Sequence, residues 1–380
     1  KSTEIFSHCI IKMSFYNLME EYKDFDFNTY LSGVSEEAVL DSIKKPKKTT
    51  RDFLNMLSPK AIKYLELMAV EGSKLTKQHF GNTLMLYIPI YISNYCTNEC
   101  IYCGFNKKNH IHRKHLNMEE IEVEAIEIAK TGIKHILLLT GEAQGLVDLE
   151  YIKNAVKVLK KHFAAVSIEI YPLEEFEYKE LQEIGVHGLT IYQETYNEEL
   201  YDKVHLSGKK KDYNYRLDCP ERGAKAKLNS VTIGPLFGLG SIKEEAFFAG
   251  LHAKYLQDNY LETEFSVSLP RMNAAEGAIS EFNMLDDISY VQIMLAYRLF
   301  MPKIGINLST RETAKFRDKV LNLGVTKFSA GSKTNVGGYS GEEGSTAQFE
   351  ISDDRSVSEI VTALKSYGRD IIFKDWELIK

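Results

Sequence analysis

The chain has 380 residues, of which 44% are hydrophobic and 26% are charged, and its formal net charge at pH 7 is −6. This composition is typical of a globular protein with ample material for a large core, organised as one large barrel or as two domains. The net negative charge excludes the basic footprint of a nucleic-acid-binding protein, and no apolar run approaches the ~20 residues that span a membrane. Five cysteines, three of them clustered, favour a reducing cytoplasm over a disulfide framework.

Residues 1–81 are predicted to form a helical extension. Ser35 precedes two acidic residues and an apolar run, and Pro59 stands where a first helical turn would begin, and both are helix-start signals. We expect these helices to form a collar packed on the domain that follows. Met13 is a candidate for the natural start of the chain, which would make residues 1–12 an upstream extension.

After Gly81, short apolar runs alternate with amphipathic helical patterns, such as the helix expected at residues 118–130. This rhythm predicts an α/β fold of parallel units, and residues 82–345 match the ~250 residues of a (β/α)8 barrel of the TIM type. Residues 346–380 would form a short C-terminal extension that covers the barrel. The expected strands are residues 84–92, 136–139, 166–170, 189–192, 228–233, 264–267, 304–308 and 327–329.

Three cysteines, Cys96, Cys100 and Cys103, follow the first expected strand with the spacing C-x3-C-x2-C. Spacing this tight lets one loop present three thiolates to a single metal centre, as soft sulfur ligands do for iron–sulfur clusters. A cluster of the [4Fe–4S] type would then keep one iron without a protein ligand. An open coordination position is what a catalytic centre requires.

The pattern C-x3-C-x-aromatic-C after a first barrel strand resembles the radical S-adenosylmethionine (SAM) superfamily. The resemblance implies a [4Fe–4S] cluster held by the three cysteines, with SAM chelating the fourth iron. One electron from the cluster would cleave SAM to methionine and a 5′-deoxyadenosyl radical. In this family the aromatic residue, Tyr102 here, lies near the adenine.

The resemblance also implies SAM-binding residues at the ends of the expected strands. Thr140-Gly141-Glu142 resembles the family's Gly-Gly-Glu motif, which holds the amino group of SAM's methionine, with Thr in the first position. Arg216 matches the family's arginine toward SAM's carboxylate, with Arg222 as the competing choice. The run Lys209–Lys211 before it is expected to be a solvated helix entrance. The other implied contacts are Glu194 for the ribose and Gly234 for the adenine.

Arg311, with Ser309 and Ser329, is predicted to clamp a substrate carboxylate. These residues stand at the ends of the seventh and eighth expected strands, and barrels place their catalytic groups at that face. A guanidinium supplies paired donors to a carboxylate, and hydroxyl groups add further hydrogen bonds. The alternative for the Gly-rich stretch after Ser329 is a flexible surface loop.

Within the superfamily, the chain resembles the aromatic amino acid lyase branch, and it is most similar to the tyrosine lyases of thiamine biosynthesis. The motifs that carry this resemblance are residues 309–312, 329–335, 348–356 and 374–376. This implies cleavage of the Cα–Cβ bond of L-tyrosine to 2-iminoacetate (dehydroglycine) and p-cresol, with SAM converted to 5′-deoxyadenosine and methionine. The implied partners are thiazole synthase, which would receive the product, and a flavodoxin or ferredoxin as electron donor.

Other functions stay open at this point. A hydrogenase maturase that also splits tyrosine carries further cysteines near its C-terminus, and the lack of any cysteine after Cys219 favours the thiamine enzyme. A tryptophan-cleaving relative shares the clamp. An alternative outside the enzymes is a non-catalytic metal-binding protein. It would hold zinc with His110, His112 or His115, or an electron-carrying cluster completed by Cys9 or Cys219.

Overall fold

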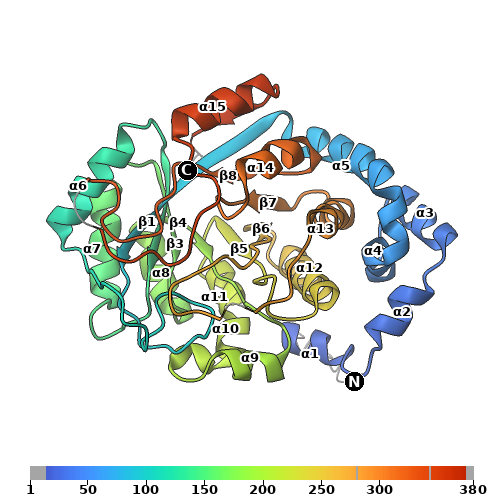
Figure 1. Cartoon of the computed structure of the whole chain (residues 1–380), viewed down its shortest axis with the longest axis horizontal. Coiled ribbons are helices and arrows are strands. Elements are labelled where there is room, and N and C mark those ends of the chain that lie inside the picture. The colour runs from blue at the N-terminus through green and yellow to red at the C-terminus, as the bar shows by residue number, and fades with distance from the viewer. Residues whose placement is uncertain (1–13, 280, 342–343, 374–380) are drawn as a thin grey trace, which may run out of the picture.

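The computed structural model describes residues 14–279, 281–341 and 344–373, and within them eight parallel strands close into a barrel (Figure 1). The strands follow one another around the barrel in chain order, and β1 pairs with both β2 and β8, which removes the open edges. The predicted (β/α)8 fold is therefore confirmed. The strands are β1 (Thr83–Ser93), β2 (His135–Thr140), β3 (Ala165–Glu169), β4 (Val186–Thr190), β5 (Ser230–Ile233), β6 (Glu264–Ser268), β7 (Gly305–Leu308) and β8 (Lys327–Ser329).

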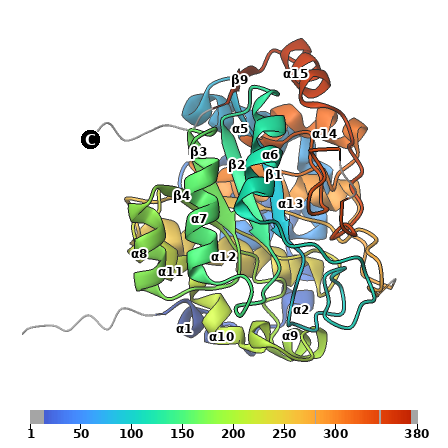
Figure 2. The ribbon, with the colours of Figure 1, turned by 90° about the vertical axis from the view of Figure 1, so that its left-hand side faces the viewer.

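Helices cover the outside of the barrel. Figure 2 shows α6 (Met118–Ala129), α7 (Leu149–Leu159) and α8 (Glu175–Glu183) over the strands β2 to β4. Their starts are fixed by side chains that accept from free backbone N–H groups, as Asn117 and Asp148 do for α6 and α7. The other α-helices between β1 and β8 are α9 (Glu198–Val204), α10 (Tyr213–Leu217), α11 (Cys219–Lys225), α12 (Ile242–Asn259), α13 (Asp287–Phe300) and α14 (Ala314–Val320).

The chain before β1 is helical, as predicted, and curves along the side of the barrel that carries α12 and α13 (Figure 1). Phe53 joins the two layers, because its ring stacks on Phe300 with centroids 4.6 Å apart. Gly250 on α12 lets that ring approach, since a Cβ there would lie 2.6 Å from it. These helices are α1 (Phe15–Glu20), α2 (Phe27–Gly33), α3 (Glu36–Lys44), α4 (Thr50–Leu57), η1 (Pro59–Tyr64) and α5 (Leu65–Phe80).

The chain after β8 crosses the barrel mouth and then returns to the opposite end. Residues 344–353, which we call the strap, form backbone hydrogen bonds with several loops at the C-terminal ends of the strands. Helix α15 (Val357–Ser366) leads from the strap to β9 (Asp370–Ile372), an additional strand that pairs with the first residues of β1. The strap bonds are Thr346 N–H to His112 O, Gly104 N–H to Gln348 O, Gln348 N–H to Thr334 O, Glu350 N–H to Ala274 O and Ser352 N–H to Thr310 O.

The predicted domain boundaries at residues 81 and 345 stay a prediction. Met13 and the motif at residues 374–376 lie outside the described residues. Among the helices that the structure describes, none is long and apolar enough to cross a membrane.

Candidate active site

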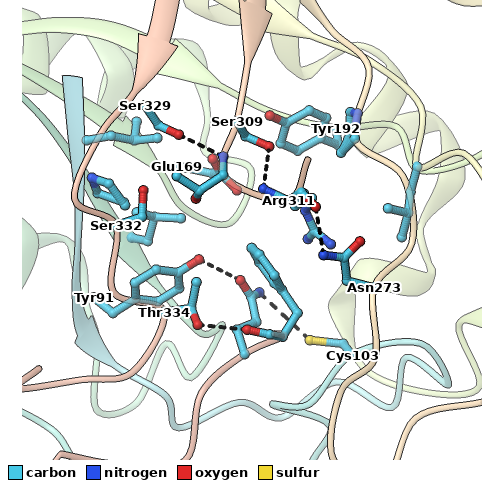
Figure 3. Close-up of a pocket in the computed structure, with 18 of the residues that line it drawn as sticks. Tyr91, Cys103, Glu169, Tyr192, Asn273, Ser309, Arg311, Ser329, Ser332 and Thr334 are labelled. Carbon is cyan, nitrogen blue, oxygen red and sulfur yellow. Dashed lines mark hydrogen bonds between the residues drawn. The ribbon is translucent and has the colours of Figure 1, made fainter. Parts of the chain in front are cut away.

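A cavity opens at the C-terminal ends of the strands, beneath the strap (Figure 3). It brings together residues from seven strands or strand ends, the cysteine loop and the strap. Of the predicted site residues, Tyr102, Cys103, Glu194, Ser309, Arg311 and Ser329 line it. Its walls also include Tyr87, Tyr91, Leu137, Leu139, Glu169, Tyr192, Lys210, Gln348 and Phe349.

The loop after β1 carries the predicted cluster ligands. The thiols of Cys96, Cys100 and Cys103 are all free, and burial raises the pKa of Cys100 to about 12 and also raises that of Cys103. Metal binding needs thiolates, so loading a metal here must displace protons. Arg113 fixes the loop from outside, because its guanidinium donates to the backbone carbonyls of Asn94 (2.6 Å), Phe105 (3.1 Å) and Asn106 (2.7 Å).

Three observations indicate that the site can hold an iron–sulfur cluster together with SAM. The donor set is three thiols in one loop, which suits iron–sulfur chemistry. The hydroxyl of Thr140 is buried without a hydrogen-bond partner among the described residues, and it stands at the end of β2 beside this loop. Gly141 is needed for close packing, because a Cβ there would lie 2.3 Å from the carbonyl oxygen of Tyr95.

No three His, Cys, Asp or Glu side chains in the described part of the chain converge to hold a single metal ion. In a cubane cluster each cysteine sulfur binds a different iron, so the three sulfurs need not converge on one point.

The predicted SAM contact Glu142 is engaged with the cysteine loop. Its carboxylate accepts from the Asn98 amide at 2.6 Å, and its backbone carbonyl accepts from the Thr97 N–H at 2.8 Å. These bonds tie the end of β2 to the loop that holds Cys96. Gly234 is also required by packing, since a Cβ there would lie 2.2 Å from the carbonyl oxygen of Ser268.

Tyr102 is held by a neutral histidine. Burial lowers the pKa of His205 to about 3, so this imidazole is uncharged at neutral pH. Its Nδ1 lies 2.8 Å from the carbonyl oxygen of Tyr201, which makes Nδ1–H the donor. The other nitrogen, Nε2, then accepts from the Tyr102 hydroxyl at 2.7 Å. The phenol ring is thereby fixed in the cavity wall.

A buried charge cluster surrounds Glu194. Its carboxylate lies 2.6 Å from Lys210 Nζ and 3.6 Å from Arg216 Nη2. Burial acts to raise the pKa of Glu194, but Lys210 and Arg216 outweigh it and hold that pKa below its usual value. The backbone of Glu194 has φ 71°, which is uncommon for a residue with a side chain and recurs at functional sites.

The expectation for the lysine run was wrong at Lys210. Instead of pointing into solvent, Lys210 lines the cavity, because Glu194 supplies the opposite charge. Arg216 lies beside the same carboxylate, whereas the competing residue Arg222 binds the carbonyls of Leu173 and Tyr215, outside the cavity lining.

Arg311 projects into the cavity near Ser309 (Figure 3). Its guanidinium carbon lies 3.3 Å from the centre of the Phe349 ring, and Nη1 donates to the carbonyl of Arg271 at 3.4 Å. Within the described residues, this guanidinium forms no ion pair with a carboxylate, and burial lowers its pKa. A partly buried cation with no carboxylate in an ion pair with it suits an anionic substrate group.

The hydroxyls of Ser309 and Ser329 lie at the same edge of the cavity. Ser329 Oγ accepts from the Thr310 N–H at 3.0 Å, and Ser309 Oγ accepts from the Arg311 N–H at 3.4 Å. Both oxygens act as acceptors in these bonds, which leaves the Ser309 proton to a ligand, whereas the Ser329 hydroxyl also forms a hydrogen bond with Tyr87.

Glu169 is a cavity residue outside the predicted site. It ends β3, and burial raises its pKa to about 7 despite the opposing effect of Arg311. Residues two apart along an extended segment point to the same face, as Glu169 and Tyr171 would, but Tyr171 does not line the cavity. The Tyr171 hydroxyl instead donates to the carbonyl of Val147 at 2.6 Å.

A closed parallel barrel with three free thiols in the loop after its first strand defines a radical SAM enzyme, and the comparisons agree. Residues 90–247 match the model of the Radical SAM superfamily, and residues 268–370 match the Biotin and Thiamin Synthesis associated domain. The chain belongs to the 2-iminoacetate synthase family of radical SAM lyases. The enzymes of this superfamily use a [4Fe–4S] cluster and SAM, which are the cofactors predicted from the sequence.

The relatives behind this assignment cover nearly the whole chain. The chain is 37% identical over 353 residues to 2-iminoacetate synthase of Escherichia coli K12, covering 93% of this chain and 94% of that one. It is 36% identical, with the same coverage, to 2-iminoacetate synthase of Salmonella typhimurium LT2. Among solved structures, the [FeFe]-hydrogenase maturase HydG superimposes with a TM-score of 0.89 at 29% identity, over 95% of this chain and 81% of that chain.

Proposed function

We propose that this chain cleaves the Cα–Cβ bond of L-tyrosine to 2-iminoacetate and p-cresol, for the thiazole of thiamine. The observation that carries the proposal is the 37% identity to 2-iminoacetate synthase over 94% of that enzyme's length. The cavity supports it, since it offers a carboxylate clamp, aromatic and apolar walls and an adjacent cysteine loop.

Cys96, Cys100 and Cys103 would hold the cluster, and Thr140, Gly141 and Glu142 would border the bound SAM. When bound, these cofactors supply a deoxyadenosyl radical that takes one hydrogen atom from the substrate. A primary radical attacks any hydrogen within reach, so the protein has to fix the substrate in one position.

Arg311 would bind the carboxylate of tyrosine with two N–H donors, and the hydroxyls of Ser309 and Ser329 would add hydrogen bonds. Phe349 keeps the guanidinium in place by packing on its face. A charge-assisted pair of this kind contributes about 1.5–3 kcal/mol to binding.

The strap and the barrel would exclude water from the reacting groups. The strap crosses the mouth at Gln348, and Leu137 and Leu139 form an apolar wall within. Exclusion of water strengthens the Arg311 contact and protects the radical from side reactions.

The substrate test is anaerobic incubation of the reconstituted enzyme with SAM, dithionite and either L-tyrosine or L-tryptophan. Tyrosine should give p-cresol and 5′-deoxyadenosine together. The product of tryptophan cleaved at the same bond would be 3-methylindole, and its formation in preference to p-cresol would overturn the proposal. Deoxyadenosine that forms at the same rate without either amino acid would overturn it as well.

The expected partners follow from the same proposal. Thiazole synthase would consume 2-iminoacetate, and a flavodoxin or ferredoxin would reduce the cluster. We expect these steps to take place in the cytoplasm. Co-purification of the chain with thiazole synthase, and turnover driven by reduced flavodoxin in place of dithionite, would test these two assignments.

A further inference from the structure

Gln348, on the strap, has both ends of its side-chain amide engaged. The Tyr91 hydroxyl donates to Oε1 at 2.8 Å, and Nε2 donates to the sulfur of Cys103 at 3.9 Å. In Figure 3 the dashed lines from Tyr91 and Cys103 meet on this one side chain. Because a phenol donates its proton to the amide oxygen, the NH2 group is the end that faces the sulfur.

The approach of the strap to the cysteine loop is built into the backbone. Gly104, the residue after Cys103, donates its N–H to the carbonyl of Gln348 at 3.3 Å. A Cβ at Gly104 would lie 2.6 Å from that carbonyl oxygen and 3.1 Å from the carbonyl oxygen of Ala347. Glycine is therefore required at this position for the strap to lie so close, and only then can Gln348 reach the sulfur.

The strap also touches the proposed substrate clamp. Phe349, the next residue, packs on the guanidinium of Arg311 with 3.3 Å between the guanidinium carbon and the ring centre. Thr334 Oγ1 donates to the carbonyl of Phe349 at 2.8 Å, which fixes this part of the strap. Two consecutive residues thus contact a proposed cluster ligand and the proposed clamp.

We infer that Gln348, oriented by Tyr91, is a positioning residue that raises the reduction potential of the cluster through its N–H···S bond to Cys103. Reduction adds negative charge to the cluster and its sulfur ligands. A donor aimed at one of those sulfurs stabilises the reduced form more than the oxidised form. The inference rests on the proposed cluster ligands, but it is independent of which amino acid the enzyme cleaves.

The test is a redox titration of the reconstituted enzyme without SAM or substrate, followed by EPR of the reduced cluster. Iron and sulfide contents are measured for each variant. Gln348→Leu removes the donor, and Gln348→Glu replaces it with a group that is negative when ionised, so both should shift the midpoint potential to more negative values. At the wild-type midpoint, the ratio of reduced to oxidised cluster in Gln348→Leu should fall about three- to tenfold, as for one ordinary hydrogen bond.

Tyr91→Phe leaves Gln348 in place but frees its amide to turn, so it should lower the potential by a smaller amount. Gln144→Leu is the matched control, because Gln144 is a glutamine whose bond goes to Lys209 instead of a sulfur. It should keep the wild-type potential.

Wild-type potentials in both Gln348 variants, at full cluster content, would overturn the inference. If the Gln348 variants fail to load a cluster, Tyr91→Phe decides: a wild-type potential there also overturns the inference. Loss of the cluster in Cys103→Ala checks the ligand assignment separately. A failure of tyrosine cleavage alone would leave these potentials unchanged, so the two proposals can fail independently.

Discussion

Replacement of Gly141 by alanine should damage the cysteine loop specifically. The added Cβ would lie 2.3 Å from the Tyr95 carbonyl oxygen, which is 0.7 Å short of the 3.0 Å that real Cβ contacts essentially always exceed, and 3.3 Å from the Cβ of Cys96. The loop cannot simply withdraw. Gly141 donates its N–H to the carbonyl of Ser93 at 2.9 Å, and Thr97 donates to the carbonyl of Glu142 at 2.8 Å, so both sides of the clash are tied together.

The expected cost of this overpacking is about 1–3 kcal/mol in the free energy of unfolding. The strain falls on the backbone next to Cys96, so Gly141→Ala should also bind less iron and sulfide per chain after reconstitution. Denaturant unfolding and metal analysis measure the two effects.

The matched control is Gly145→Ala. Gly145 lies with Gly141 in the segment between β2 and α7, and nothing lies within 4 Å of the new Cβ. It should load the cluster normally. Equal stability and equal iron content in the two variants would refute the account of how this loop is packed.

Three further outcomes are expected. Arg311→Lys keeps a charge but loses the paired donors, so the KM for tyrosine should rise about tenfold or more at unchanged iron content; an unchanged KM would remove Arg311 from the clamp. Glu169 has a pKa of about 7, so it is neutral below that pH and becomes an anion above it, where it competes with the substrate carboxylate for Arg311. Tyrosine binding should therefore weaken as pH rises through about 7, and a pH profile of Glu169→Gln that still shows this weakening would contradict the assignment. Cys96→Ala should lose both p-cresol and deoxyadenosine in product analysis, and retention of either would exclude Cys96 as a required ligand.

The strands and the cysteine loop were predictable because their signals are local. Parallel barrel strands are buried on both faces, so each reads as an apolar run bounded by polar residues, as in the consecutive residues Leu84, Met85 and Leu86 of β1, which are at most 3% exposed. The cysteine motif is likewise local, because all three cysteines lie in one loop and their spacing can be read directly from the sequence.

Contacts between distant loops were not predictable. Lys210 looks like part of a solvated run until the fold places it 2.6 Å from Glu194, and nothing near Gln348 in the sequence indicates that it reaches Cys103. The strand β9 was also missed. It is only three residues long, and it pairs with β1 because β2 begins at His135, too late to cover the first residues of β1.

We propose that Cys96, Cys100 and Cys103 hold a cluster whose remaining iron is open to SAM. The most direct measurement is the EPR spectrum of the reduced, anaerobically reconstituted enzyme before and after SAM is added. Chelation at the open iron changes the electronic structure of the cluster, so the account predicts a shifted spectrum. A reduced [4Fe–4S] spectrum that stays the same at saturating SAM would contradict it.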